Sequence, residues 1–255
     1  MRPARIIDRT DWAPGLWSIR LDTSLEEFVP GRFVNVGLEI DGALVKRSYS
    51  LGSAPNAPPE LYLVRVEGGA LTPRLHDLGP GDELLVNPHA AGFFTLDEVP
   101  DARDLWMLAT GTGIAPFLSM LRAGADDLRR RFERIVVVHG VRFLRDLGYR
   151  AELEALAARG TITYVPATTR EPATAGVDAD DVATRMGPLR GRLPHLIESG
   201  ALATRVGVDL SAAHSHVMLC GNPAMIDAAA TVLAARDMVK HRRRRPGHVT
   251  FEKYW

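Results

Sequence analysis

Residues 105–116 read LWMLATGTGIAP, and this stretch decides the fold of the second half of the chain. Residues 105–109 form a continuous apolar run, which is typical of a parallel strand covered by helices on both faces. Gly111 and Gly113 follow at once, and a helical stretch begins at Phe117. A strand, a glycine loop and a helix in this order indicate a nucleotide loop at the carboxyl edge of a parallel sheet. The glycine motif by itself is unspecific, because Pro116 occupies the third position of the Gly-x-Gly-x-x-Gly fingerprint.

The alternation of strands and helices continues towards the C-terminus. Further apolar runs are each followed by a helical stretch, and that order predicts a doubly wound α/β domain on a parallel sheet. Residues 171–187, rich in Ala, Asp, Thr and Gly, are expected to form a surface excursion. The expected strands lie at 135–138, 162–165 and 217–220, and the expected helices at 117–121, 150–158, 193–197 and 224–236.

The first hundred residues follow a different, period-two pattern. Apolar and polar residues alternate over 17–21 and 34–40, as in half-buried strands, and Asp41-Gly42 is a hairpin turn signal. Short strands at 61–66 and 83–86, between Gly- and Pro-containing turns, predict a closed antiparallel β-barrel. The chain is long enough for two compact domains. We therefore expect a β-barrel domain at 1–99 and an α/β domain at 100–255.

Composition argues against several classes of protein. The formal net charge of the 255 residues is zero, so no global field favours nucleic acid. The single cysteine, Cys220, excludes an internal disulfide and a built-in iron–sulfur cluster, which needs four ligands. The eight histidines show no metal-ligand spacing, so no metal is expected. No apolar run approaches the roughly 20 residues of a membrane span, and no apolar signal core opens the chain, so a cytoplasmic location is expected.

Two segments indicate a large planar anionic ligand. Arg47-Ser48-Tyr49-Ser50 offers a cation, a ring and hydroxyls, and in an extended segment the arginine and the tyrosine share one face. The chain ends on Tyr254 and Trp255, although chain ends are usually polar, so this aromatic pair is expected to lie against a flat group such as a flavin dinucleotide. The alternative for the first segment is an ordinary strand with a surface arginine and a half-buried tyrosine.

Two loops lead into expected helices on the ligand side. Thr72-Pro73 suits a helix N-cap followed by proline, and the N–H groups there form either a phosphate site or a plain capped helix. In Cys220-Gly221-Asn222-Pro223, the asparagine is expected to cap the helix that the proline opens. The cysteine is either a small buried residue or borders a crevice that takes a nicotinamide.

Arginines near strand ends indicate a second anionic group. Arg142, Arg170 and Arg192 each follow an expected strand or open a helix, and converging arginines suit a phosphate monoester such as a ribose 2′-phosphate. Taken singly, each is better explained as a solvated surface residue. The run Arg242, Arg243, Arg244 and Arg245 is either a solvated face or a docking site for an acidic redox partner.

Together these segments resemble the ferredoxin/flavodoxin–NADP reductase family, specifically its bacterial branch. The resemblance covers nearly the whole chain and implies an FAD-binding barrel followed by an NADP-binding α/β domain. Glu252-Lys253-Tyr254 is similar to the Glu-x-Tyr ending of plastid relatives, with Trp255 added. The resemblance rests on the order and spacing of Arg47-Ser48-Tyr49-Ser50, residues 111–116, residues 220–223 and the aromatic end, and residues 91–94 and 243–248 look like the branch with enterobacterial flavodoxin reductases.

The resemblance also implies roles for individual residues. Arg47 would contact the FAD pyrophosphate, Tyr49 would stack on the isoalloxazine, and Ser50 would reach toward flavin N5. Cys220 would lie beside the nicotinamide, and Ser50, Cys220 and Glu252 would be the catalytic residues. The FAD-binding set would be Arg47, Ser48, Tyr49, Ser50, Tyr62, Leu63, Val64, Arg65, Ala70, Leu71, Thr72, Thr112, Tyr254 and Trp255. The NADP-binding set would be Gly111, Gly113, Arg142, Thr169, Arg170, Arg192, Cys220, Gly221 and Asn222.

The residues and the resemblance lead to one expected function. It is an FAD-dependent oxidoreductase that moves electrons between NADPH and ferredoxin or flavodoxin, with a hydride delivered to flavin N5 and electrons then released singly. The acceptor would dock on basic residues such as Arg242 to Arg245, neither nucleic acid nor a membrane would be a partner, and a monomer is the family expectation. Two alternatives stay open, a reductase that serves an oxygenase or free flavin, and a non-catalytic flavin redox sensor.

Overall fold

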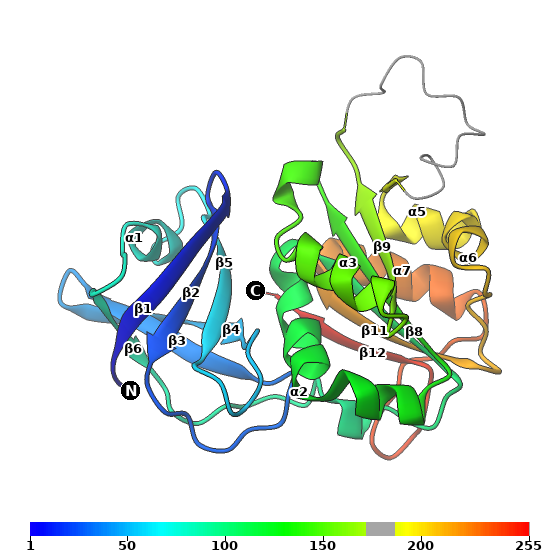
Figure 1. The fold of residues 1–255 in the computed structure, drawn as a ribbon, viewed down its shortest axis with the longest axis horizontal. Helices are drawn as coiled ribbons and strands as arrows, with labels where there is room; N and C mark the ends of the chain where they lie inside the picture. Colours follow the sequence, from blue (N-terminus) through cyan, green and yellow to red (C-terminus); the bar gives the residue numbers. More distant parts are fainter. Residues whose placement is uncertain (172–186, 255) are drawn as a thin grey trace. The chain divides into compact units, whose positions relative to one another are not determined.

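The computed structural model describes residues 1–171 and 187–254, and the chain packs as two compact units (Figure 1). The first unit comprises Met1–Glu98 together with Ala115–Ala125. The second comprises Val99–Ile114 and the chain from Asp126 onward. The chain thus leaves the first unit after Glu98, returns to it for eleven residues of one helix, and then stays in the second unit. The domain ranges expected from the sequence do not contain this return.

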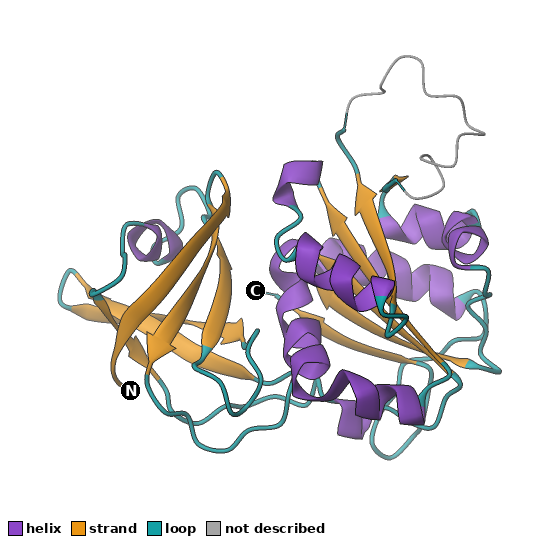
Figure 2. Ribbon diagram, viewed as in Figure 1, coloured by secondary structure: helices purple, strands orange, loops and turns teal. Residues whose placement is uncertain are grey.

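The first unit is a six-stranded antiparallel sheet that closes on itself (Figure 2). Its strand order is β4-β3-β6-β1-β2-β5, and a bridge between Leu51 and Leu61 joins the end of β4 to β5. The antiparallel barrel predicted from the sequence is thereby confirmed. The strands are β1 (Arg2–Ala13), β2 (Leu16–Asp22), β3 (Phe33–Ile40), β4 (Ala43–Ser50), β5 (Glu60–Val64) and β6 (Glu83–Val86).

Local sequence explains the β3–β4 hairpin and the core of this unit. Asp41 and Gly42 have φ of 50° and 77°, the left-handed pair that a two-residue hairpin turn requires. This turn pairs Ile40 with Ala43 and fixes the register of the whole of β4. The alternating residues Trp17, Ile19 and Leu21 are at most 1% exposed and form part of the core. The helices α1 (Thr72–His76) and η1 (Leu96–Glu98) follow later in the chain.

The second unit is a six-stranded parallel sheet with helices on both faces. Its order is β10-β9-β8-β7-β11-β12, and residues 105–109 of the central β7 are all 0% exposed. Helices α5, α6 and α7 pack on one face, and α3 lies on the opposite face in Figure 1. The strands are β7 (Asp104–Thr110), β8 (Arg134–Val141), β9 (Thr163–Thr168), β10 (Leu189–Arg190), β11 (Ser215–Gly221) and β12 (Val249–Lys253). The helices are η2 (Gly111–Ile114), α2 (Ala115–Arg131), η3 (Leu144–Asp146), α3 (Arg150–Ala158), α5 (Leu193–Glu198), α6 (Ala201–Val206) and α7 (Pro223–Ala234).

The strand order reverses direction between β7 and β11. After β7 the chain builds β8, β9 and β10 on one side, and then crosses back to add β11 and β12 on the other. In open α/β sheets ligands bind outside the carboxyl ends of the strands at such a switch point. The expected excursion at 171–187 falls almost wholly outside the described residues. Within the described ranges, no helix has the length and apolar character needed to cross a membrane.

Candidate functional site

The loops that follow β7 and β11 are in direct contact at the switch point. The Asn222 N–H donates to Thr110 Oγ1 at 3.0 Å. A Cβ atom added to Gly113 would lie 2.4 Å from the Cys220 carbonyl oxygen, and one added to Gly221 would lie 2.3 Å from Thr110 Oγ1. Real Cβ atoms do not approach other atoms so closely, so both positions require glycine. The two loops therefore leave bare backbone at the place where an α/β sheet binds its ligand.

Asn222 and Tyr254 complete this edge of the second unit. Asn222 Oδ1 accepts the N–H groups of Ala224 and Met225, so it caps α7 as the sequence predicts. Tyr254 follows β12 and donates its backbone N–H to the Gly221 carbonyl at 3.0 Å and its hydroxyl to the Thr112 carbonyl at 3.2 Å. The penultimate aromatic residue is therefore tied to both loops, whereas Trp255 lies outside the described residues.

His139 supports the loop that follows β7, and sequence reasoning missed this residue. It lies on β8 beside Ala109, and its Nε2 donates to the Gly111 carbonyl at 3.0 Å. Because the C=O and N–H of a trans peptide point in opposite directions, the Thr112 N–H points away from His139. Burial lowers the pKa of His139 to about 4, so the ring is neutral at pH 7. The available signal was a histidine placed directly after the apolar run 135–138.

The neutral His139 predicts acid lability of the second unit. Its pKa is about 4 in the folded state and about 6.5 in the unfolded chain, so the unfolded state takes up the proton first as the pH falls. This contribution to stability is full above pH 6.5 and declines towards pH 4, by about 3 kcal/mol in total. Between pH 7 and pH 5, both proteins should lose free energy of unfolding in urea titrations. We expect that loss to be about 2 kcal/mol smaller for His139→Gln than for wild type. Parallel pH profiles for the two proteins would contradict this prediction.

Cys220 is the last residue but one of β11 and is fully buried. Its thiol is 0% exposed, and burial raises its pKa well above the usual value, with the nearby Glu252 raising it further. Hydrogen bonds with Tyr254 and the Gly221 backbone act in the opposite direction. The thiol is therefore protonated at neutral pH and is not a nucleophile. Glu252 lies opposite Cys220 in the β11–β12 register.

The predicted arginines come to one edge of the sheet. Arg142, Arg170 and Arg192 follow the adjacent strands β8, β9 and β10, and all three are exposed. The Arg170 N–H donates to the Arg142 carbonyl at 2.9 Å, so their backbones are neighbours. Thr169 directly precedes Arg170 and donates its N–H to the carbonyl of Val141, the residue before Arg142, at 3.1 Å. Arg192 is the N-cap of α5, as its place in the sequence predicts. Three guanidinium groups on adjacent strand ends suit a phosphate monoester.

In the first unit, the end of β4 carries the predicted ring-and-cation segment. Tyr49 is half-buried, and its hydroxyl has no hydrogen-bond partner among the described residues. Burial raises the pKa of Tyr49 to about 12, although the Arg47 charge opposes this. Ser48 donates to Asn35 Oδ1 at 3.0 Å, and Ser50 is 4% exposed. A buried hydroxyl without a partner is costly, so the segment fits a ligand that accepts this hydrogen bond.

The other expected FAD residues of the first unit lie on β5, just after it, and around the start of α1. Leu63 and Leu71 are 1% and 3% exposed and belong to the barrel core, so only their backbone groups could reach a ligand. Thr72 is the first residue of α1 and not its N-cap, which is Leu71. Its Oγ1 instead accepts the Val66 N–H at 2.9 Å, and this competing turn contact explains why the predicted cap was wrong. The remaining members are Tyr62 and Val64 on β5, followed by Arg65 and Ala70.

Comparisons with known proteins agree with this arrangement. A family profile described as an oxidoreductase NAD-binding domain matches residues 107–231. Flavodoxin/ferredoxin–NADP reductases of Shigella flexneri and Escherichia coli (strain K12) are each 45% identical over 249 residues, covering 96% of this chain and 95% of each relative. The structure of a ferredoxin NADP+ reductase from Neisseria gonorrhoeae with bound FAD and NADP matches with a TM-score of 0.88 and 28% identity, covering 100% of this chain and 98% of that chain. Because this similarity extends along almost the whole length of the chain, the chain belongs to the flavodoxin/ferredoxin–NADP reductase family.

Proposed function

We infer that this chain is an FAD-dependent oxidoreductase that transfers electrons between NADPH and ferredoxin or flavodoxin. The observation that carries the inference is 45% identity, over 96% of the chain, to proteins named flavodoxin/ferredoxin–NADP reductases. FAD, when bound, supplies the step from two-electron hydride chemistry to single-electron release. The residues of the chain bind and orient the two nucleotides.

We propose that the end of β4 holds the FAD. Tyr49 would stack on the flavin and give its unpartnered hydroxyl an acceptor on the ligand. Arg47 is exposed and would pair with the pyrophosphate, and the buried Ser50 would donate toward flavin N5. Backbone groups of β5 and of residues 70–72 would line the rest of the site within the first unit.

We propose that NADP(H) binds at the switch point of the second unit. The bare backbone at Gly111, Gly113 and Gly221 would admit the pyrophosphate, and the Thr112 N–H, which points away from His139, would donate to it. Arg142, Thr169, Arg170 and Arg192 would hold the 2′-phosphate. Cys220 and Asn222 would border the nicotinamide. Glu252 would be the residue that handles protons near it.

The inference is tested on purified protein in three steps. We expect the protein to be yellow after gel filtration, its flavin to bleach with NADPH in stopped flow, and the reduced protein to pass electrons to ferredoxin or flavodoxin. Colourless protein that neither binds added FAD nor quenches its fluorescence would overturn the inference. Reduction of free flavin alone would favour the first alternative, and flavin that NADPH does not bleach would favour a redox sensor.

Replacing Tyr49 by phenylalanine is expected to have opposite effects on the apo and FAD-bound proteins. The variant removes a buried hydroxyl that lacks a protein partner, so the apo protein should gain about 1 kcal/mol in its free energy of unfolding. With FAD present the same variant loses one hydrogen bond, and the FAD dissociation constant should rise about fivefold to tenfold. Calorimetry and fluorescence titration measure the two effects. An apo protein that is destabilised instead would show that Tyr49 already has a partner in the protein.

We propose that the acidic electron acceptor docks on the run Arg242 to Arg245. These four residues are exposed and form a closed turn, in which Arg242 and Arg245 exchange backbone hydrogen bonds of 3.0 and 2.8 Å. The turn precedes β12, so it lies at the amino ends of the parallel strands, about 17 Å along that strand from Tyr254. Charge reversal at Arg243 and Arg244 should raise the KM for ferredoxin or flavodoxin and weaken its salt dependence. Reversal at the exposed Arg2 is the control, and equal effects of the two reversals would contradict docking on this turn.

We further propose that the protein acts in the cytoplasm as a monomer. Sedimentation of the FAD-bound protein tests the oligomeric state, and cell fractionation tests the location.

A further inference from the structure

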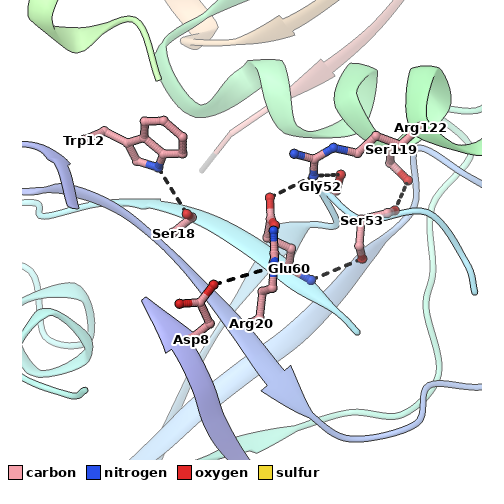
Figure 3. A network of polar contacts seen from close by, with 9 residues as sticks. All are labelled: Asp8, Trp12, Ser18, Arg20, Gly52, Ser53, Glu60, Ser119 and Arg122. Carbon is pink, nitrogen blue, oxygen red and sulfur yellow. Dashed lines mark hydrogen bonds and ion pairs between the residues drawn. The ribbon is translucent and has the colours of Figure 1, made fainter. Parts of the chain in front are cut away.

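Glu60 is a buried carboxylate held between two arginines inside the first unit (Figure 3). It is 4% exposed and starts β5. Its Oε2 accepts from Arg20 Nε at 2.9 Å and its Oε1 accepts from Arg122 Nη1 at 2.8 Å. Arg20 reaches it from β2, whereas Arg122 reaches it from the part of α2 that packs with this unit. Burial of a carboxylate is unfavourable unless both oxygens are paired, and here both are.

The same cluster grips the backbone that follows β4. Arg122 Nη1 also donates to the Gly52 carbonyl at 2.7 Å, and the Gly52 N–H donates to the Glu60 carbonyl at 2.8 Å. The Glu60 N–H donates to Ser53 Oγ at 3.1 Å, and Ser119 Oγ donates to the Ser53 carbonyl at 2.6 Å. Polar groups of Gly52 and Ser53 are thus fastened from β5 on one side and from α2 on the other, as Figure 3 shows.

The fastened residues directly follow the segment assigned to the flavin. Gly52 is two residues after Ser50 and three after Tyr49. The one residue between Ser50 and Gly52 is Leu51, which is 0% exposed. Leu51 is itself fixed by its bridge to Leu61 on β5. The other end of β4 is fixed by the two-residue hairpin at Asp41 and Gly42. Strand β4, which carries the ring, the cation and the hydroxyl, is therefore fixed at both of its ends. The clamp formed by Glu60 and Arg122 is the polar part of that support.

We propose that Glu60 and Arg122 are positioning residues for the flavin, which set the geometry of Tyr49 and Ser50 through the backbone of Gly52 and Ser53. Neither acts on the reacting atoms directly. The proposal rests on the proposed function, since it assigns the end of β4 to FAD. A support of this kind matters because a small misplacement of a catalytic group far from its cause can reduce a rate by a large factor.

Glu60→Gln is the first test, because it keeps the shape of the side chain and removes its charge. At saturating FAD we expect the visible circular dichroism of the bound flavin to change, and flavin reduction by NADPH to slow about tenfold. The FAD dissociation constant should rise by at least the same factor. Asp8→Asn is the matched control, because Asp8 pairs with the same Arg20 at 3.7 Å but is about half exposed. We expect this control to match wild type in all three measurements.

Arg122→Met separates a clamp from two independent contacts. If Glu60 and Arg122 act as one unit, the double variant Glu60→Gln, Arg122→Met should impair flavin reduction no more than the worse single variant. Should the Glu60 and Arg122 variants fail to fold, Ser119→Ala carries the test, since it deletes only the hydroxyl bond to Ser53. That variant is expected to shift the flavin dichroism and to slow flavin reduction about threefold.

Three outcomes decide between the proposals. Variants that unfold at lower temperature, yet match wild type in flavin dichroism and reduction rate at saturating FAD, would show that the clamp is merely structural. Additive effects in the double variant would overturn the single clamp. Wild-type protein that binds no FAD would overturn the proposed function itself. Normal FAD binding by both wild type and variants would instead leave the proposed function intact and count against the clamp alone.

Discussion

Gly221→Ala is expected to abolish NADPH-dependent turnover while leaving FAD bound. Gly221 has a φ of +129°, and a Cβ there would lie 2.3 Å from Thr110 Oγ1 and 2.7 Å from the Thr110 carbonyl oxygen. The alanine therefore adds backbone strain and a clash against the neighbouring loop, each costing about 1–3 kcal/mol. To make room, the two loops must separate and break the hydrogen bond from the Asn222 N–H to Thr110 Oγ1. Stopped-flow reduction of the flavin by NADPH and urea unfolding measure the two losses.

Gly207→Ala is the matched control for this variant. Gly207 lies in the same unit and has a φ of +72°, but a Cβ there would meet nothing within 4 Å. The control therefore isolates the strain of a left-handed residue, about 1 kcal/mol, without the clash. We expect it to keep NADPH-dependent turnover. If both variants reduced their flavin at the same rate, the nicotinamide nucleotide could not bind at the switch point between β7 and β11.

The double variant Arg170→Ala, Arg192→Ala is expected to reduce the preference for NADPH over NADH about a hundredfold. A hydrogen bond to a charged group contributes about 1.5–3 kcal/mol, which is roughly tenfold or more for each arginine. NADH lacks the 2′-phosphate, so its kcat/KM should change little. Arg170 and Arg192 come shortly after the adjacent strands β9 and β10. Ratios of kcat/KM for NADPH and NADH, measured for wild type and for the single and double variants, give the result.

Arg150→Ala controls for the general loss of a positive charge from the second unit. Arg150 begins α3 and pairs with Glu154 at 2.6 Å. Its removal should leave the cofactor preference unchanged. If the double arginine variant instead lost activity equally with NADPH and NADH, the assignment of this edge to the 2′-phosphate would be wrong.

Local sequence was sufficient wherever a few neighbouring residues decide the conformation. The apolar run of residues 105–109 became β7, and Asp41 with Gly42 formed the two-residue hairpin turn. Asn222 capped α7 and Pro223 opened it, because both effects act within three residues. Strand β1 (Arg2–Ala13) was not predicted from the sequence. The reason is that register shifts between Ile6 and Asp8 and between Asp11 and Ala13 interrupt its period-two pattern.

The sequence by itself thus determined the two kinds of sheet, their order along the chain and the loops at which nucleotides are expected to bind. Only the tertiary structure decided which groups meet at those loops. Glu60 is paired with residues 40 and 62 positions away, and His139 supports a carbonyl 28 positions away. The physical reason is that hydrogen bonding and steric exclusion act over a few ångströms in space, and strand register and packing bring distant residues within that range.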